Sequence, residues 1–263
     1  MLMKLLKYDL KWSYRHLVIF YISTLLFALF TRFFLSFDNS TIFDIIGKIC
    51  AGVTISLIVN ILINNFTRVW VRFTRNIYGD ESYLTHTLPV NRKDVYLSKT
   101  LLAIITMFTS ILVILISLFL CYYSKENLDI IKSFLEIVAS TYDSTVLGLM
   151  IAFGITFFLE MVVVLLTGFM GIIIGHSYNH GKVLKSVLFS FLIYFMVQTL
   201  TLIAIFIFGL FNADIMSLFT SNDPFSSDTI KLILAVAIIL YSVYIVVIDF
   251  INRKLFNKGI NID

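Results

Sequence analysis

One carboxylate, Glu160, lies near the middle of an apolar run over residues 146–174. A carboxylate in hydrocarbon is costly unless it is protonated or partnered, so this side chain must face protein or water. At about 100° per residue, Thr156, Thr167 and Gly171 share its helical face. This polar face indicates either a pathway for protons or solutes or an interhelical hydrogen bond from a neutral acid, and the residues alone leave both interpretations open.

Amide and hydroxyl side chains form similar stripes on two other apolar runs. One run carries Ser56, Asn60 and Asn64 on a single face, and another carries Gln198 beside Tyr194. Amides in hydrocarbon seek hydrogen-bond partners, so we expect these faces to point into the assembly. Each stripe alone indicates polar contacts between helices. Together they favour a polar pathway lined by Ser56, Asn60, Asn64, Thr156, Glu160 and Gln198.

The remaining motifs do not indicate an enzyme. His176 and His180 have the spacing of a metal-binding pair, but no carboxylate or thiolate nearby completes the ligand set, so no metal site is expected. Residues 175–183, G-H-S-Y-N-H-G-K-V, differ from a phosphate-binding loop because five residues separate the glycines and Val183 replaces the hydroxyl that would bind magnesium. We therefore expect no ATPase, no catalytic residues and no directly bound cofactor in this chain.

Six long apolar runs must position these side chains. They cover residues 17–35, 49–66, 101–123, 146–174, 187–211 and 230–248. Each approaches or exceeds the roughly 20 residues needed to cross a hydrocarbon core about 30 Å thick. The composition, with 59% hydrophobic and 14% charged residues and a mean hydropathy of +0.96, is also that of an integral membrane protein. We therefore predict an all-α membrane protein with six transmembrane helices in a single domain, 1–263.

The basic residues indicate how these spans are oriented. With the N-terminus inside, fifteen of the twenty Lys and Arg residues fall on the cytoplasmic side, as is typical of short cytoplasmic loops. Both termini are then cytoplasmic. The net charge of +4 is explained by this topology and by contact with anionic membrane lipids, so it does not indicate nucleic acid binding.

Residues 1–16 are predicted to form an amphipathic interfacial helix on the cytoplasmic leaflet. Its basic stripe consists of Lys4, Lys7, Lys11 and Arg15, and leucines follow another stripe. The helix is expected to turn into the first span near Arg15 and His16. A simple basic flank of that span is the alternative interpretation.

Residues 67–99 form the largest cytoplasmic segment and join the second and third spans. Gly79 is typical of a helix end, and Asn91 with Asp94 three residues later resembles the start of the next helix. One short helix fits between these signals, before Pro89. A partly apolar segment at the inner surface is typical of a docking element for a cytoplasmic partner, but a solvated loop is an equally good interpretation of the pattern.

Residues 78–90, Y-G-D-E-S-Y-L-T-H-T-L-P-V, are similar to the G-Y-L-T-x-T-L-P-V segment of the permease subunits of ABC type-2 exporters. With its interfacial helix and six spans, the chain resembles the small stand-alone permeases of Gram-positive bacteria. The resemblance implies a region that couples to a separate ATP-binding subunit, made of Tyr83, Leu84, Thr85, His86, Thr87, Leu88 and Pro89.

The resemblance also implies that the partner subunit uses the ATP, and that a second permease subunit, identical or different, completes the substrate route across the bacterial plasma membrane. The expected cargo is a small molecule, a peptide or a lipid-like compound, such as an antimicrobial peptide or a drug. The alternative function is a proton-coupled secondary transporter that uses Glu160. An intramembrane enzyme or a sensor is less favoured because the sequence contains no catalytic constellation.

Overall fold

The computed structural model describes residues 1–37, 41–87, 89–122, 133, 146–220 and 227–258. The chain divides into two compact units, Met1–Asp129 (unit 1) and Ile130–Asp263 (unit 2), and each is described by itself. The single membrane domain expected over 1–263 stays a prediction.

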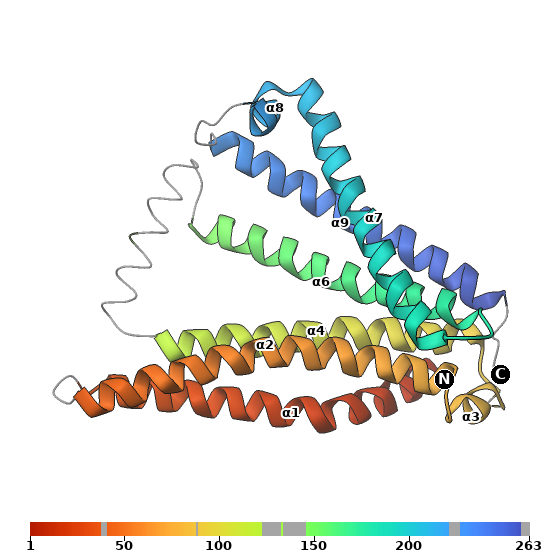
Figure 1. The fold of residues 1–263 in the computed structure, drawn as a ribbon, viewed down its shortest axis with the longest axis horizontal. Coiled ribbons are helices and arrows are strands. Elements are labelled where there is room, and N and C mark those ends of the chain that lie inside the picture. Colours follow the sequence, from red (N-terminus) through yellow and green to blue (C-terminus); the bar gives the residue numbers. More distant parts are fainter. Residues whose placement is uncertain (38–40, 88, 123–132, 134–145, 221–226, 259–263) are drawn as a thin grey trace. The chain divides into compact units, whose positions relative to one another are not determined.

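The described residues are helical apart from short connections (Figure 1). Among them, six helices are long and apolar enough to cross a membrane: α1 (Leu2–Leu35), α2 (Thr41–Ile77), α4 (Arg92–Tyr122), α6 (Val146–His176), α7 (Lys182–Phe211) and α9 (Ser227–Asn257). Two short helices are α3 (Ser82–Thr87) and α8 (Ala213–Thr220). The prediction of an all-α protein with six apolar, membrane-length helices is confirmed, whereas the side on which the termini lie stays a prediction.

The N-terminal region differs from its prediction. Residues 2–35 form one unbroken helix of 34 residues, α1, with no turn near Arg15 and His16. This stretch contains no glycine or proline that would favour a break. The buried residues of α1 recur every three or four positions: Leu6, Asp9, Ser13, Leu17, Tyr21, Thr24, Ala28 and Thr31. Residues 1–16 are therefore continuous with the first span, and their location on a membrane surface stays a prediction.

In unit 1, α1 packs against both α2 and α4 (Figure 1). Leu17, Tyr21 and Ile61 form a buried cluster, and Val113 and Ile114 of α4 pack against it. Burial of such side chains removes apolar surface from contact with the surroundings and fixes which faces of the helices meet. The three helices thus form one bundle, and α3 lies at the end of this bundle that holds the N-terminus of α1 (Figure 1). We call this the α3 end of unit 1.

In unit 2, α6 packs against α7 and α9. Leu165 and Phe169 of α6 are fully buried. A Cβ atom on Gly171 would overlap the Ser190 backbone of α7, so only glycine permits this approach of the two helices. One turn along, Gly175 meets the Ser186 backbone in the same way. Both glycines therefore let the backbones of α6 and α7 approach closely.

Candidate functional site

The short helix α3 contains most of the segment that the sequence identifies as a coupling region. Tyr83 and Leu84 are 75% and 67% exposed, whereas Thr85 is buried. Thr87 and Pro89 are exposed as well. The side chain of His86 and the whole of Leu88 lie outside the described residues. The side chains of Tyr83 and Leu84 are therefore accessible to a partner protein, whereas the Thr85 side chain of the same helix is buried against the rest of the chain.

Local backbone contacts explain why α3 forms where it does. The Tyr78 and Gly79 amides both donate to the Thr74 carbonyl oxygen, at 2.8 and 3.0 Å, which ends α2. A Cβ on Gly79 would lie only 3.0 Å from the Arg75 Cα, so glycine suits this position. The predicted helix end at Gly79 is confirmed, and α4 begins directly after Asn91 as predicted.

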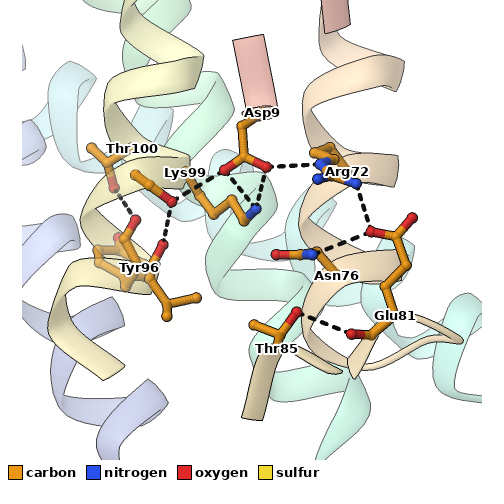
Figure 2. A network of polar contacts seen from close by, with 10 residues as sticks. Asp9, Arg72, Asn76, Glu81, Thr85, Tyr96, Lys99 and Thr100 are labelled. Atoms are coloured by element: carbon orange, nitrogen blue, oxygen red, sulfur yellow. Dashed lines mark hydrogen bonds and ion pairs between the residues drawn. The ribbon is translucent and has the colours of Figure 1, made fainter. Parts of the chain in front are cut away.

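Asp9 is the centre of a buried ionic network at the α3 end of unit 1 (Figure 2). Lys99 Nζ donates to both carboxylate oxygens of Asp9 at 2.7 Å. Arg72 Nε donates to Asp9 Oδ1 at 2.8 Å, and Ser98 Oγ donates to Asp9 Oδ2 at 3.2 Å. The side chains of Asp9, Arg72 and Lys99 are all buried. One carboxylate therefore joins α1, α2 and α4.

The same network reaches the base of α3 through Glu81. Arg72 Nη1 donates to Glu81 Oε2 at 2.6 Å, and Asn76 Nδ2 donates to the same oxygen at 3.2 Å. The backbone oxygen of Glu81 accepts a hydrogen bond from Thr85 Oγ1 at 3.0 Å, within the first turn of α3 (Figure 2). Arg72 thus bridges two carboxylates, and Glu81, the residue directly before α3, is connected through Arg72 and Asp9 to all three helices of the bundle.

Charge balance makes this network sensitive to the loss of a member. Two carboxylates, Asp9 and Glu81, face two cations, Arg72 and Lys99. Removing one partner of a buried ion pair leaves an uncompensated charge and typically costs about 3–5 kcal/mol. That cost applies to the buried pairs of Asp9 with Arg72 and Lys99, whereas the partly exposed Glu81 contributes less.

Aromatic residues enclose the ions. The ring of Trp12 lies against the guanidinium groups of Arg72 and Arg68, with centroid distances of 5.2 and 5.7 Å. The Phe73 ring packs edge-on against Tyr96, and the Tyr78 ring also packs against Phe73, with a centroid distance of 6.5 Å. Burial raises the pKa of the Tyr78 phenol, which stays protonated. The α3 end of unit 1 is thus well packed up to the exposed side chains of α3.

The polar face predicted on α2 is not the face that unit 1 buries. Asn65 is fully buried and its Nδ2 donates to Ser110 Oγ at 2.8 Å, and the hydroxyl of Tyr21 lies 2.7 Å from the same oxygen. Ser56 and Asn60 are exposed, and Asn64 is partly exposed. This face is therefore not buried within unit 1, and the expectation that it points into the assembly stays a prediction.

In unit 2, Glu160 lies on a half-buried face of α6. The Tyr194 hydroxyl of α7 donates to Glu160 Oε1 at 3.5 Å, a long hydrogen bond. The side chain of Gln198 lies beside the hydroxyl groups of Tyr194 and Tyr241. Thr156 donates to the Ala152 carbonyl oxygen of its own helix. The structure thus brings Glu160 and Gln198 to one polar cluster with Tyr194, and Thr156 lies one turn from Glu160 on α6.

Asp9 and Lys99 were missed by the sequence analysis as site residues. Asp9 is the lone acid among the basic residues of 1–16, and Leu6, Asp9, Ser13 and Leu17 recur at helical spacing. That spacing was the available signal, because it places Asp9 on an otherwise buried face.

Comparisons with protein-family models, with curated proteins and with solved structures give no match for this chain. Within the described residues, no group of three or more His, Cys, Asp and Glu side chains could hold a metal ion. Function is therefore inferred from the residues and their geometry.

Proposed function

We propose that this chain is the membrane permease subunit of an ATP-driven ABC exporter in the bacterial plasma membrane, working with a separate ATP-binding subunit. The observation that supports this most strongly is the exposed pair Tyr83 and Leu84 on a short helix anchored by buried ions. Large exposed side chains gathered on such an element are typical of a docking surface.

The anchoring of α3 supports a role in transmitting force. A six-residue helix is too short to be stable alone in water, so α3 depends on its contacts with the rest of the chain. Those contacts pass from Glu81 to Arg72 and from there to Asp9. In the proposed mechanism, ATP binding moves the partner subunit, α3 moves with it, and the network carries the displacement to α1, α2 and α4 together.

The proposed cargo is a small molecule, a peptide or a lipid-like compound. Polar residues of unit 2, namely Thr156, Glu160 and Gln198, are proposed to line the pathway. The position of Gln198 beside Tyr194 supports this, because it places the amide in the same polar cluster as Glu160.

Co-purification tests the proposed function. The unchanged chain, extracted from its native membrane in mild detergent, should recover an ATP-binding subunit. Replacing Tyr83 and Leu84 with alanine should abolish that recovery without changing the thermal stability of the chain, because both side chains are exposed. Tyr8→Ala is a matched control, since Tyr8 is an equally exposed aromatic residue outside α3. Recovery of no nucleotide-binding partner with the unchanged chain would contradict the proposal.

A proton-coupled secondary transporter is the second candidate. The position of Glu160 favours it, because an ionisable side chain within a membrane-length helix is typical of a proton pathway, and Glu160 contacts the Tyr194 hydroxyl there. Under this alternative, Glu160→Gln abolishes transport driven by a pH gradient. Under the leading proposal, ATP-dependent transport needs the Tyr83–Leu84 pair and no pH gradient.

A further inference from the structure

α2 carries a polar face that the bundle of unit 1 leaves open. Gly52, Ser56, Asn60 and Thr67 are exposed, and Asn64 is partly exposed. These residues recur every four or three positions, so they form one stripe along the apolar part of the helix. We call this stripe the α2 polar face. Its two amides lie within a helix long and apolar enough to cross a membrane.

The amides of this face have unused hydrogen-bonding capacity. Asn60 Nδ2 donates to the Ser56 carbonyl oxygen at 3.0 Å, and Asn64 Nδ2 donates to the Asn60 carbonyl oxygen at 2.9 Å. Each amide group has two N–H donors and one carbonyl acceptor. Among the described residues, each of these two side chains makes only that single bond, so a donor and an acceptor remain on each. Exposing them to lipid is unfavourable, so the face needs a protein partner.

We propose that this partner is the same face of a second copy of the chain. A two-fold contact requires a surface that is complementary to itself, and amides meet this requirement because they both donate and accept. Gly52 adds room for close approach, since a Cβ there would contact nothing within unit 1. The inference rests on the proposed function, which requires two permease subunits. It assigns the second subunit as an identical chain.

The described amides within the helices of unit 2 do not offer an equivalent surface. Asn252 is fully buried and its Nδ2 donates to the Leu166 carbonyl oxygen at 3.0 Å. Gln198 lies beside Tyr194 and Tyr241 of its own unit. A second α2 polar face therefore matches the donors and acceptors of Asn60 and Asn64 best.

Cysteine cross-linking tests the contact in membranes of a host that expresses this chain without an ATP-binding subunit. The two native cysteines, Cys50 and Cys121, are free and buried, and both are first replaced with alanine. The hydrogen bond between Asn65 of α2 and Ser110 of α4 shows that these two residues lie at the same height along the bundle. Asn60 and Leu115 are each five residues further from the α3 end, so they also lie at similar heights. Oxidation with copper phenanthroline should link Asn60→Cys chains into dimers. Leu115→Cys, on an exposed position of α4, should stay monomeric.

The result is unambiguous in either direction. Equal cross-linking at both positions, or a monomeric Asn60→Cys chain, would overturn the inference. A monomeric Asn60→Cys chain is also the expected result if another part of the same chain, or a different protein, covers the α2 polar face. A second measurement uses Asn60→Leu with Asn64→Leu, which should weaken dimerisation about tenfold if two interhelical hydrogen bonds are lost. Ser242→Leu is the control, because Ser242 is an exposed hydroxyl on α9 bonded to its own helix.

These experiments use the chain expressed without an ATP-binding subunit, so they fail independently of the proposed function. A cross-linked dimer in a chain that recruits no ATP-binding partner would keep the inference and contradict the exporter proposal. If the chain recruits an ATP-binding partner but never cross-links through α2, the exporter proposal is kept and the inference of a two-fold α2 contact is contradicted.

Discussion

The two units of this protein hold their helices together by different means. In unit 1, the α3 end depends on Asp9 and the cations around it, together with hydrogen bonds such as that between Asn65 and Ser110. In unit 2, α6 and α7 meet through small residues at which the backbones almost touch. Removing one partner of a buried ion pair typically costs about 3–5 kcal/mol, whereas adding a methyl group to a close-packed contact typically costs about 1–3 kcal/mol.

The two central carboxylates differ in the same way. Asp9 accepts hydrogen bonds from Arg72, Lys99 and Ser98, whereas Glu160 has one long contact with Tyr194. A carboxylate held by two cations is suited to fix a structure. Among the described residues, the contact of Glu160 with a neutral hydroxyl constrains that carboxylate much less. The comparison therefore separates a carboxylate with several short ionic contacts in unit 1 from one with a long, neutral contact in unit 2.

The largest expected effect is that of Asp9→Ala. It leaves Lys99 buried without its counter-ion and should lower the free energy of unfolding by about 3–5 kcal/mol, measured by thermal or denaturant unfolding in detergent. The control is Asp44→Ala, which removes the exposed pair with Lys48 and should cost no more than about 1 kcal/mol. If Asp9→Ala and Asp44→Ala lower the free energy of unfolding equally, the buried network does not stabilise the contact of α1 with α2 and α4.

A change at the α6–α7 contact should have a smaller effect. Gly171→Ala adds a Cβ that overlaps the Ser190 backbone, and overpacking of this kind typically costs about 1–3 kcal/mol. Gly154→Ala on the same helix meets open space and should be neutral or slightly stabilising. Unfolding measured on both variants compares the two positions directly. If Gly171→Ala is as harmless as Gly154→Ala, close packing is not what joins α6 to α7.

Loss of the link between α3 and the bundle should change local dynamics more than stability. Glu81 is 34% exposed, so Glu81→Gln weakens its pair with Arg72 at a cost of about 1 kcal/mol or less. Amide hydrogen exchange should nevertheless become several-fold faster in α3, because that helix depends on Glu81 for its attachment. Asp80→Asn, which changes an exposed neighbour, should leave exchange unchanged. If amide hydrogen exchange in α3 is unchanged in Glu81→Gln, the Glu81–Arg72 pair does not attach α3 to the bundle, and the proposed transmission of movement through this pair is contradicted.

Local sequence signals predicted the features that depend on neighbouring residues. The apolar runs predicted the six long helices, Gly79 predicted the end of α2, and Asn91 predicted the start of α4. Each of these depends on properties within a few turns of one helix. Such features can be predicted from one sequence because no distant partner is needed to define them.

The ionic network could not be predicted in the same way. Lys99 contacts a residue 90 positions away, so its sequence neighbourhood shows only a basic residue near a membrane span. Likewise, Asn64 and Asn65 differ by one position, or about 100° around the helix, and only the packing of α1 and α4 decides which amide is buried. The continuous α1 followed from the same packing, since Asp9 and Ser13 extend its buried face toward the N-terminus.

Site-specific photo-cross-linking from position 83 tests the central claim most directly. A photoreactive amino acid in place of Tyr83, incorporated in living cells, should form an adduct with an ATP-binding subunit, and the same amino acid in place of Tyr8 should not. This is expected because the Tyr83 side chain is exposed on a helix that the Glu81–Arg72–Asp9 contacts hold in place. An adduct with lipid alone, or labelling of position 83 by a reagent confined to the outside of the cell, would contradict the account.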